Sequence, residues 1–120
     1  MWIWAVVGVV VALFVVLKLK ASYRSPSQLE AIKKALAADA PLVDVRSKAE
    51  FSGSHLSRAI NVPVAELPGS LKKVGRPKKP VVVYCATGSR SAMAARTLRA
   101  NGFEQVLDLG PLSNGSKIGR

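Results

Sequence analysis

The chain opens with an uninterrupted apolar segment. Residues 2–17 carry no charged or strongly polar side chain, and Gly8 is their only member that is not hydrophobic. Extended through Leu19, the segment would reach roughly 27 Å as a helix, close to the ~30 Å of a bilayer's hydrocarbon core. The pattern therefore predicts a transmembrane anchor helix at residues 1–20, with residues 2–19 in contact with membrane lipid.

Two other interpretations of this segment stay open, a cleaved signal peptide and a buried core helix. A signal peptide carries its basic residues before the apolar segment, whereas here Lys18, Lys20 and Arg24 come at its end or after it. A retained anchor fits this order better. Because positive residues stay on the cytoplasmic side of a membrane, we expect a single-pass protein of a bacterial inner membrane whose domain faces the cytoplasm.

After a linker at residues 21–27, strand-like and helix-like patterns alternate. Apolar runs at 41–45 and 80–84 predict buried strands, and shorter extended segments are expected at 59–63 and 105–109. The run at 80–84 is rich in valine and continuous in apolarity, which favours a central position in a parallel sheet.

Helices are expected between these strands. Ser27 with Glu30, and Ser47 with Glu50, have the spacing of a capping box, which typically starts a helix. The second of these opens a short helix near Phe51. Three longer helices are expected at 28–38, 65–74 and 89–100.

The length and the order of elements together predict one domain. A chain of 120 residues allows little more than that, and strands that alternate with helices indicate a small α/β fold with a parallel sheet. We expect this domain at residues 28–112, followed by a flexible tail at residues 113–120.

The chain is strongly basic, with a net charge of +11. Such a charge suits nucleic acid, anionic lipid headgroups or small anionic substrates. Nucleic-acid binding is not favoured, because no aromatic interleaving or binding motif accompanies the charge. The densest cluster is either a solvated turn or a contact for anionic lipid or an acidic protein partner. Its members are Lys72, Lys73, Arg76, Lys78 and Lys79.

The single cysteine is the candidate for chemistry. One cysteine and one histidine cannot make a disulfide or a closed set of metal ligands, so neither a metal nor another cofactor is expected. Cys85 follows the predicted central strand and precedes a helix, where ligands of α/β sheets bind. The connecting loop aims backbone N–H groups and one positive charge at this point, which favours thiolate over thiol. The alternative is a buried, inert strand-end cysteine. The loop consists of Ala86, Thr87, Gly88, Ser89 and Arg90.

Several short motifs resemble the single-domain rhodanese family. They are CATGSR from Cys85, LVDVR at 42–46, EF at 50–51 with HL at 55–56, and AINVP at 59–63. Their order and spacing match the family over residues 28–110. The resemblance implies a rhodanese-like three-layer fold with a central five-stranded parallel sheet flanked by helices, preceded here by one transmembrane helix. It also implies a thiosulfate:cyanide-type sulfurtransferase, in which an anionic donor such as thiosulfate loads a cysteine persulfide and a thiol or cyanide unloads it.

The resemblance assigns roles to individual residues. Cys85 matches the family's nucleophile, and residues 86–90 match the loop whose amides hold the sulfur. Asp44 matches an aspartate that braces the site. Arg46 matches an arginine that can help to bind an anionic donor, although a surface position or a pair with Glu50 remains open. His55 matches a structural turn and is expected to bond to backbone.

Two other functions are weighed against sulfur transfer. Related phosphatases and arsenate reductases use a loop that is one residue longer, so the spacing from Cys85 to Arg90 disfavours them. A non-enzymatic module that binds a partner or carries a persulfide at the membrane remains open. The end of the chain departs from the family, since Gly115 lies near a usual tryptophan position. We therefore expect a weak or missing closing helix.

Overall fold

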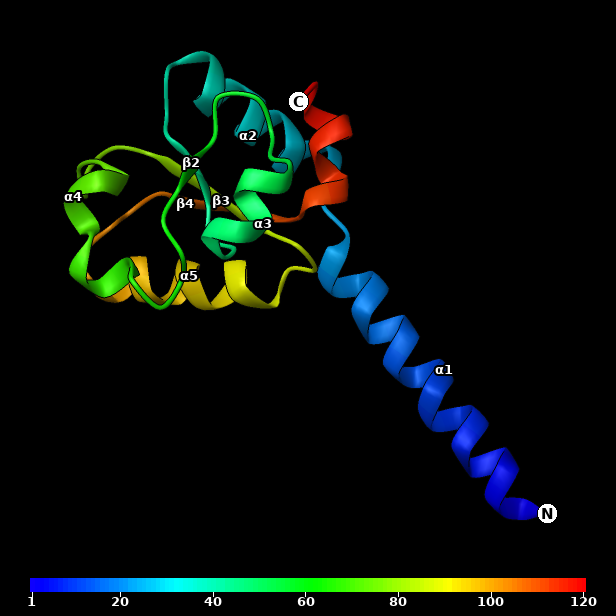
Figure 1. The fold of residues 1–120 in the computed structure, drawn as a ribbon. Coiled ribbons are helices and arrows are strands. Elements are labelled where there is room, and N and C mark those ends of the chain that lie inside the picture. The colour runs from blue at the N-terminus through cyan, green and yellow to red at the C-terminus, as the bar shows by residue number, and fades with distance from the viewer.

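The computed structural model describes residues 1–120 and divides into a long helix and a domain (Figure 1). Helix α1 (Trp2–Ser22) projects away from the domain, and none of its residues is buried. It is long and apolar enough to cross a membrane by length and composition. The helix runs two residues past the expected end at residue 20, so only residues 23–25 separate it from the next helix.

The domain is built on a four-stranded parallel sheet, which confirms the predicted α/β class. The strand order is β2-β1-β3-β4, and β3 is both central and fully buried, as its run of valines predicts. The strands are β1 (Leu42–Asp44), β2 (Ile60–Asn61), β3 (Val81–Cys85) and β4 (Val106–Pro111).

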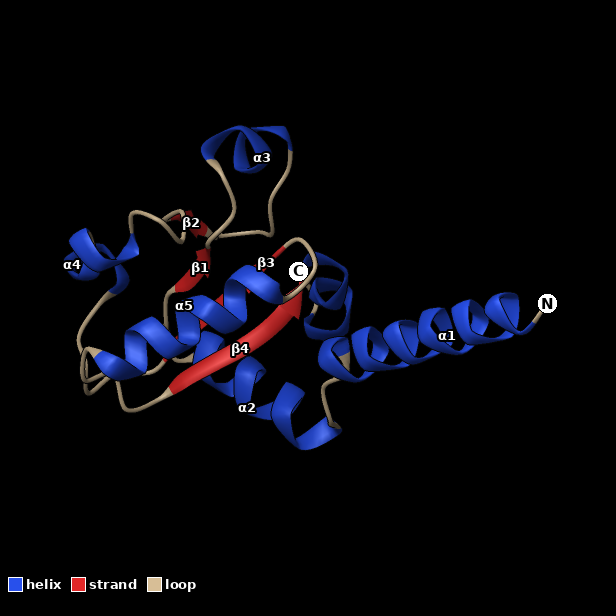
Figure 2. Ribbon diagram, turned by 90° about the horizontal axis from the view of Figure 1, so that it is seen from below, coloured by secondary structure: helices blue, strands red, loops and turns tan.

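Two apolar cores cover the two faces of this sheet. One core joins alternate residues of β3, including Val83 and Cys85, to α5 (Ser89–Ala100). The other joins Val82 and Tyr84 to α2 (Pro26–Ala37). Figure 2 shows α5 and α2 on opposite sides of β4. The alternation of β3 side chains between two layers places Cys85 on the α5 side.

The sheet has one strand fewer than the five that the resemblance implied. Because α1 remains helical through Ser22, the short segment before α2 adds no strand next to β4. The free edge of β4 is covered by side chains instead. Arg99 donates to the carbonyl of Val106 at 3.1 Å, and Arg24 donates to the carbonyl of Asp108 at 2.6 Å.

Local capping decides where two helices begin. α3 (Lys48–Gly53) has the predicted capping box between Ser47 and Glu50. α2 begins earlier than expected, because Ser25 is its N-cap and forms the box with Gln28, while Pro26 occupies the first helical position. The box predicted at Ser27 is therefore wrong.

The expected helix at 65–74 is broken in two. A short 3-10 helix, η1 (Leu67–Gly69), is followed by α4 (Leu71–Val74). Pro68 and Gly69 lie between them, and both residues weaken a continuous helix. α4 lies at the end of the domain that is farthest from α1 in both views (Figures 1 and 2).

The last residues differ from the flexible tail that the sequence predicts. They form a 3-10 helix, η2 (Leu112–Ile118), in which Gly115 and Ile118 are buried. Ile118 belongs to the core on the α2 face. The side chain of Leu56 packs against Gly115 where a larger residue would have its Cβ. The glycine that departs from the family pattern thus permits close packing here.

Candidate functional site

Cys85 ends the central strand and is fully buried. Its Sγ accepts a hydrogen bond from the backbone N–H of Gly88 at 3.0 Å. Gly88 has φ +103°, in the region that favours glycine, and it is the N-cap residue of α5. Ser91 also donates to the carbonyl of Gly88 at 3.1 Å. The chain therefore turns from strand to helix in a conformation that directs an amide at the sulfur.

The other residues of the loop differ in exposure. Ala86 is half-buried, while Thr87 and Ser89 are exposed. Their backbone N–H groups make no hydrogen bond to Sγ, so Gly88 is the loop amide that the structure places on the sulfur.

Arg90 is held by an ion pair with Glu50. The two side chains form parallel bonds of 2.7 and 3.0 Å, which link the first turn of α5 to α3. The Arg90 guanidinium lowers the pKa of Glu50 to about 2. The Glu50 carboxylate in turn raises the pKa of Arg90, and a charged Cys85 contributes in the same direction. The charge of Arg90 therefore interacts with Cys85, but its guanidinium is bonded to the Glu50 carboxylate.

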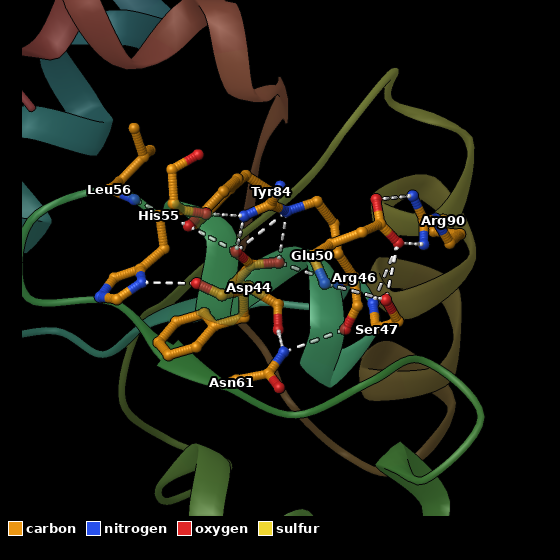
Figure 3. A network of polar contacts seen from close by, with 11 residues as sticks. Asp44, Arg46, Ser47, Glu50, His55, Leu56, Asn61, Tyr84 and Arg90 are labelled. Carbon is orange, nitrogen blue, oxygen red and sulfur yellow. Dashed lines mark hydrogen bonds and ion pairs between the residues drawn. The ribbon is translucent and has the colours of Figure 1, made fainter.

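A buried polar network is built around Asp44, Arg46 and Tyr84, the residue before Cys85 (Figure 3). The carboxylate of Asp44 accepts hydrogen bonds from the Arg46 side chain at 2.7 and 3.0 Å and from the Tyr84 hydroxyl at 2.7 Å. The Tyr84 hydroxyl also accepts from the backbone N–H of Leu56 at 3.1 Å. The Arg46 guanidinium donates further to the carbonyl of Ser54. Every member of the network therefore has a partner.

The network shifts two pKa values. Hydrogen bonding to Asp44 raises the pKa of Arg46, and burial raises the pKa of Tyr84 to about 12. Arg46 is only 5% exposed. The Arg46 guanidinium forms a buried ion pair with Asp44. It does not pair with Glu50, which the sequence left open as an alternative.

The sequence interpretation missed two of these partners. The apolar run at 80–84 predicts Tyr84 only as a strand residue, although a buried tyrosine hydroxyl normally has a hydrogen-bond partner. Its position directly before Cys85 is the signal that could have identified it. Glu50 was assigned to a capping box, and it also pairs with Arg90.

His55 takes a structural role, as expected. Its Nδ1 lies 2.8 Å from the carbonyl oxygen of Phe51, and the two rings stack with centroids 3.7 Å apart. No cluster of three or more His, Cys, Asp or Glu side chains is positioned to hold a metal ion.

The basic cluster lies away from the cysteine. Lys72 and Lys73 belong to α4, and the other three members lie between α4 and β3. α4 is at the end of the domain opposite α1 (Figure 1). The structure therefore links Arg90 electrostatically to Cys85, while Asp44 and Arg46 join the network of Tyr84, whose side chain lies on the other face of the sheet. The basic cluster lies outside both groups.

Known proteins resemble this chain in sequence and in fold. Residues 25–110 match the model of the rhodanese-like domain family. The uncharacterized protein YqhL of Bacillus subtilis is 41% identical over 70 residues, which cover 58% of this chain and 55% of the relative. This chain thus spans about half the length of that relative.

A curated enzyme and a solved structure extend the comparison. Thiosulfate sulfurtransferase GlpE of Coxiella burnetii is 32% identical over 87 residues, which cover 72% of this chain and 80% of the relative. A structure of a rhodanese with anions from E. coli superposes with a TM-score of 0.59 and 29% identity, covering 62% of this chain and 88% of that chain. Because the family match covers residues 25–110, the protein belongs to the rhodanese-like domain family, and a thiosulfate sulfurtransferase is among its relatives.

Proposed function

We propose that the protein is a sulfurtransferase that carries sulfane sulfur as a persulfide on Cys85. The observation that carries the proposal is the N–H of Gly88, which donates to Sγ at 3.0 Å at the end of the central strand. A backbone donor of this kind stabilises a negatively charged sulfur. The same donor favours the thiolate that attacks and the persulfide that results.

The reaction has two displacement steps. The Cys85 thiolate attacks the outer sulfur of thiosulfate, a new S–S bond forms, the S–S bond of thiosulfate breaks, and sulfite leaves with the electron pair. The persulfide anion then gives its outer sulfur to a thiophilic acceptor. With cyanide the products are thiocyanate and the regenerated thiolate, so atoms and charge balance. The thiosulfate sulfurtransferase named among the relatives supports thiosulfate as the donor to try first.

The neighbouring ion pairs support the loop. Arg90 and Glu50 hold the start of α5 against α3, and the Tyr84 hydroxyl, which donates to the Asp44 carboxylate at 2.7 Å, ties the end of β1 to β3. Because Arg46 is buried and paired, we assign it a positioning role and not direct contact with the donor. Both contacts fix segments that flank Cys85 and Gly88.

We also propose that the protein is anchored in a membrane. α1 spans the bilayer as a single anchor, and residues 23–25 lead from it into the first helix of the domain. The lack of buried residues along α1 supports this arrangement, and the basic residues at the domain end of α1 support a cytoplasmic domain. The substrate class is a small anionic sulfur donor with a thiol or cyanide acceptor.

The test follows sulfur on the full chain in non-ionic detergent. Intact mass is measured before and after thiosulfate, and thiocyanate is measured after cyanide is added. We expect a gain of one sulfur atom that cyanide removes with release of thiocyanate. Because Cys85 is the single cysteine, Cys85→Ser is a clean control and gains nothing.

Two other results would change the proposal. A stable sulfur adduct that no acceptor removes would favour a persulfide-carrying module over an enzyme. A wild-type chain that gains no sulfur from thiosulfate or from an organic persulfide would contradict sulfur transfer.

A further inference from the structure

The end of α1 is fixed to the domain by side chains. Arg24 donates to the carbonyl of Ala21 at 2.7 Å and to the carbonyl of Asp108 at 2.6 Å. Asn114 donates to the carbonyl of Ser22 at 2.8 Å. The bonds to Ala21 and Ser22 satisfy carbonyls that the end of a helix leaves without partners. Helix α1 therefore continues into the domain through a defined joint and not through a loose linker.

The joint lies beside the cysteine. Pro111, at the end of β4, pairs with Cys85 in the sheet, and neighbouring strands are about 4.8 Å apart. A pocket of about 310 Å³ opens between this strand end, the last turns of α1 and the loop after Cys85. Pro111 and Ala86 both line it. One is the neighbour of Cys85 across the sheet and the other is its neighbour along the chain.

The anchor helix forms one wall of this pocket. Lys18, Leu19 and Ser22 line it from α1, and Thr87 lines it from the loop. The Lys18 ammonium lies 5.7 Å from the centroid of the Phe14 ring, one turn farther toward the N-terminus. This contact with the ring is weak, and the lysine stem has four rotatable bonds, so an anion in the pocket can compete with Phe14 for the ammonium.

Lys18 is the cation that this pocket offers. An anionic sulfur donor needs a positive group near the cysteine, but Arg46 is paired with Asp44 and Arg90 is paired with Glu50. Lys18 makes no ion pair with any carboxylate of the chain. Thr87 adds a hydroxyl on the opposite wall, whereas the Ser22 hydroxyl already donates to the carbonyl of Lys18 at 3.0 Å.

We propose that this pocket is the donor site, and that Lys18 of the anchor helix binds the oxyanion group of an anionic sulfur donor such as thiosulfate. The inference rests on the proposed sulfur transfer and adds a specificity residue outside the domain. The anchor is part of the substrate site, and loading takes place at the level of the lipid headgroups.

The test compares two lysines of the same helix. Lys18→Gln and Lys20→Gln are each made in the full chain in non-ionic detergent, where no anionic lipid competes, and persulfide loading is timed at increasing thiosulfate. Lys20 is exposed on α1 and does not line the pocket. We expect Lys18→Gln to raise the half-saturating thiosulfate concentration about fivefold, the size of one solvent-exposed ion pair. The maximal loading rate stays unchanged, and Lys18→Arg restores the wild-type value.

Salt and lipid give independent readouts. The difference between Lys18→Gln and wild type shrinks as ionic strength rises, because salt screens a charge of this kind. Added phosphatidylglycerol raises the half-saturating concentration of wild type more than that of Lys18→Gln, since its phosphate competes for the same ammonium. Equal half-saturation of both glutamine variants and wild type would overturn the inference while leaving the proposed function intact. A wild-type chain that loads no sulfur would contradict both the donor site and the proposed sulfur transfer.

Discussion

At the scale of single residues, Tyr84 connects three segments that are distant in sequence. Its hydroxyl donates to Asp44 on β1 at 2.7 Å and accepts from the N–H of Leu56 at 3.1 Å. It precedes Cys85 on β3, so the position of the cysteine depends on a network that never touches the sulfur. A half-satisfied buried network is costly, because each unpaired group loses its contact with water as well.

We expect Tyr84→Phe to lower the free energy of unfolding by about 1–3 kcal/mol. The change leaves the buried N–H of Leu56 without its partner and removes one donor from Asp44. Urea unfolding of the full chain in detergent measures the loss. Tyr23→Phe is the matched control, because Tyr23 is 63% exposed and its hydroxyl makes no hydrogen bond in the chain. Equal stability of the two variants would contradict the role of Tyr84.

The Glu50–Arg90 pair predicts a pH dependence of stability. The pKa of Glu50 is lowered from 4.5 to about 2 by Arg90. The unfolded chain therefore binds a proton at higher pH than the folded chain does, and the pair stabilises the fold above about pH 4.5. Stability from this source is lost as the pH falls from there through 2.

We expect Glu50→Gln to be less stable than wild type near neutral pH. The difference between the two unfolding curves closes between about pH 4.5 and pH 2. Glu66→Gln serves as the control, because its carboxylate lies 3.9 Å from Lys48 in an exposed pair that contributes little. A Glu50→Gln difference that stays constant down to pH 2 would show that the charge of Glu50 is not involved.

At the scale of elements, the joint between α1 and β4 depends on one glycine. Gly110 has φ +85°, and a Cβ at this position would lie 2.9 Å from a terminal nitrogen of Arg24. The same guanidinium covers the free edge of β4 at the carbonyl of Asp108. Arg24 thus protects the edge of the sheet and holds the anchor helix at once.

We expect Gly110→Ala to cost about 1–2 kcal/mol from the left-handed backbone alone, and to displace Arg24. Trypsin should then cleave after Arg24 faster than in wild type, which gel analysis of the full chain in detergent measures. Gly69→Ala is the control, because no heavy atom lies within 4 Å of a Cβ built there. An unchanged cleavage rate in Gly110→Ala would mean that Arg24 does not depend on this space.

At the scale of the whole molecule, the two ends differ in their surroundings. The apolar helix α1 projects from one side of the domain. The loop after Cys85 lies near the end of that helix. α4 and the basic cluster lie at the far end (Figures 1 and 2). The cluster therefore lies at the end of the domain that is farthest from the bilayer that α1 would span.

We expect the full chain, expressed in bacteria, to stay in the membrane fraction after carbonate extraction. Protease added outside spheroplasts should leave the domain intact and should digest it once the inner membrane is opened. The reason is the excess of basic residues on the domain side of α1. Digestion in closed spheroplasts would show that the domain faces the periplasm, and release by carbonate would contradict the anchor.

Much of the fold and the candidate site followed from short stretches of sequence. The apolar run of α1, the box between Ser47 and Glu50, and the strand-to-helix turn at Cys85 depend on neighbours a few residues away. For that reason α5 begins and ends at the residues predicted, and the parallel sheet and candidate nucleophile could be inferred without coordinates.

Contacts between distant residues decided the rest. The bond from Tyr84 to Asp44 spans 40 positions, and the bond from Asn114 to Ser22 spans 92. No local pattern records such pairs, because they form only when packed elements bring the groups into reach. The bond from Tyr84 to Asp44, the packed η2 and the place of Lys18 beside the loop therefore belong to the tertiary structure alone.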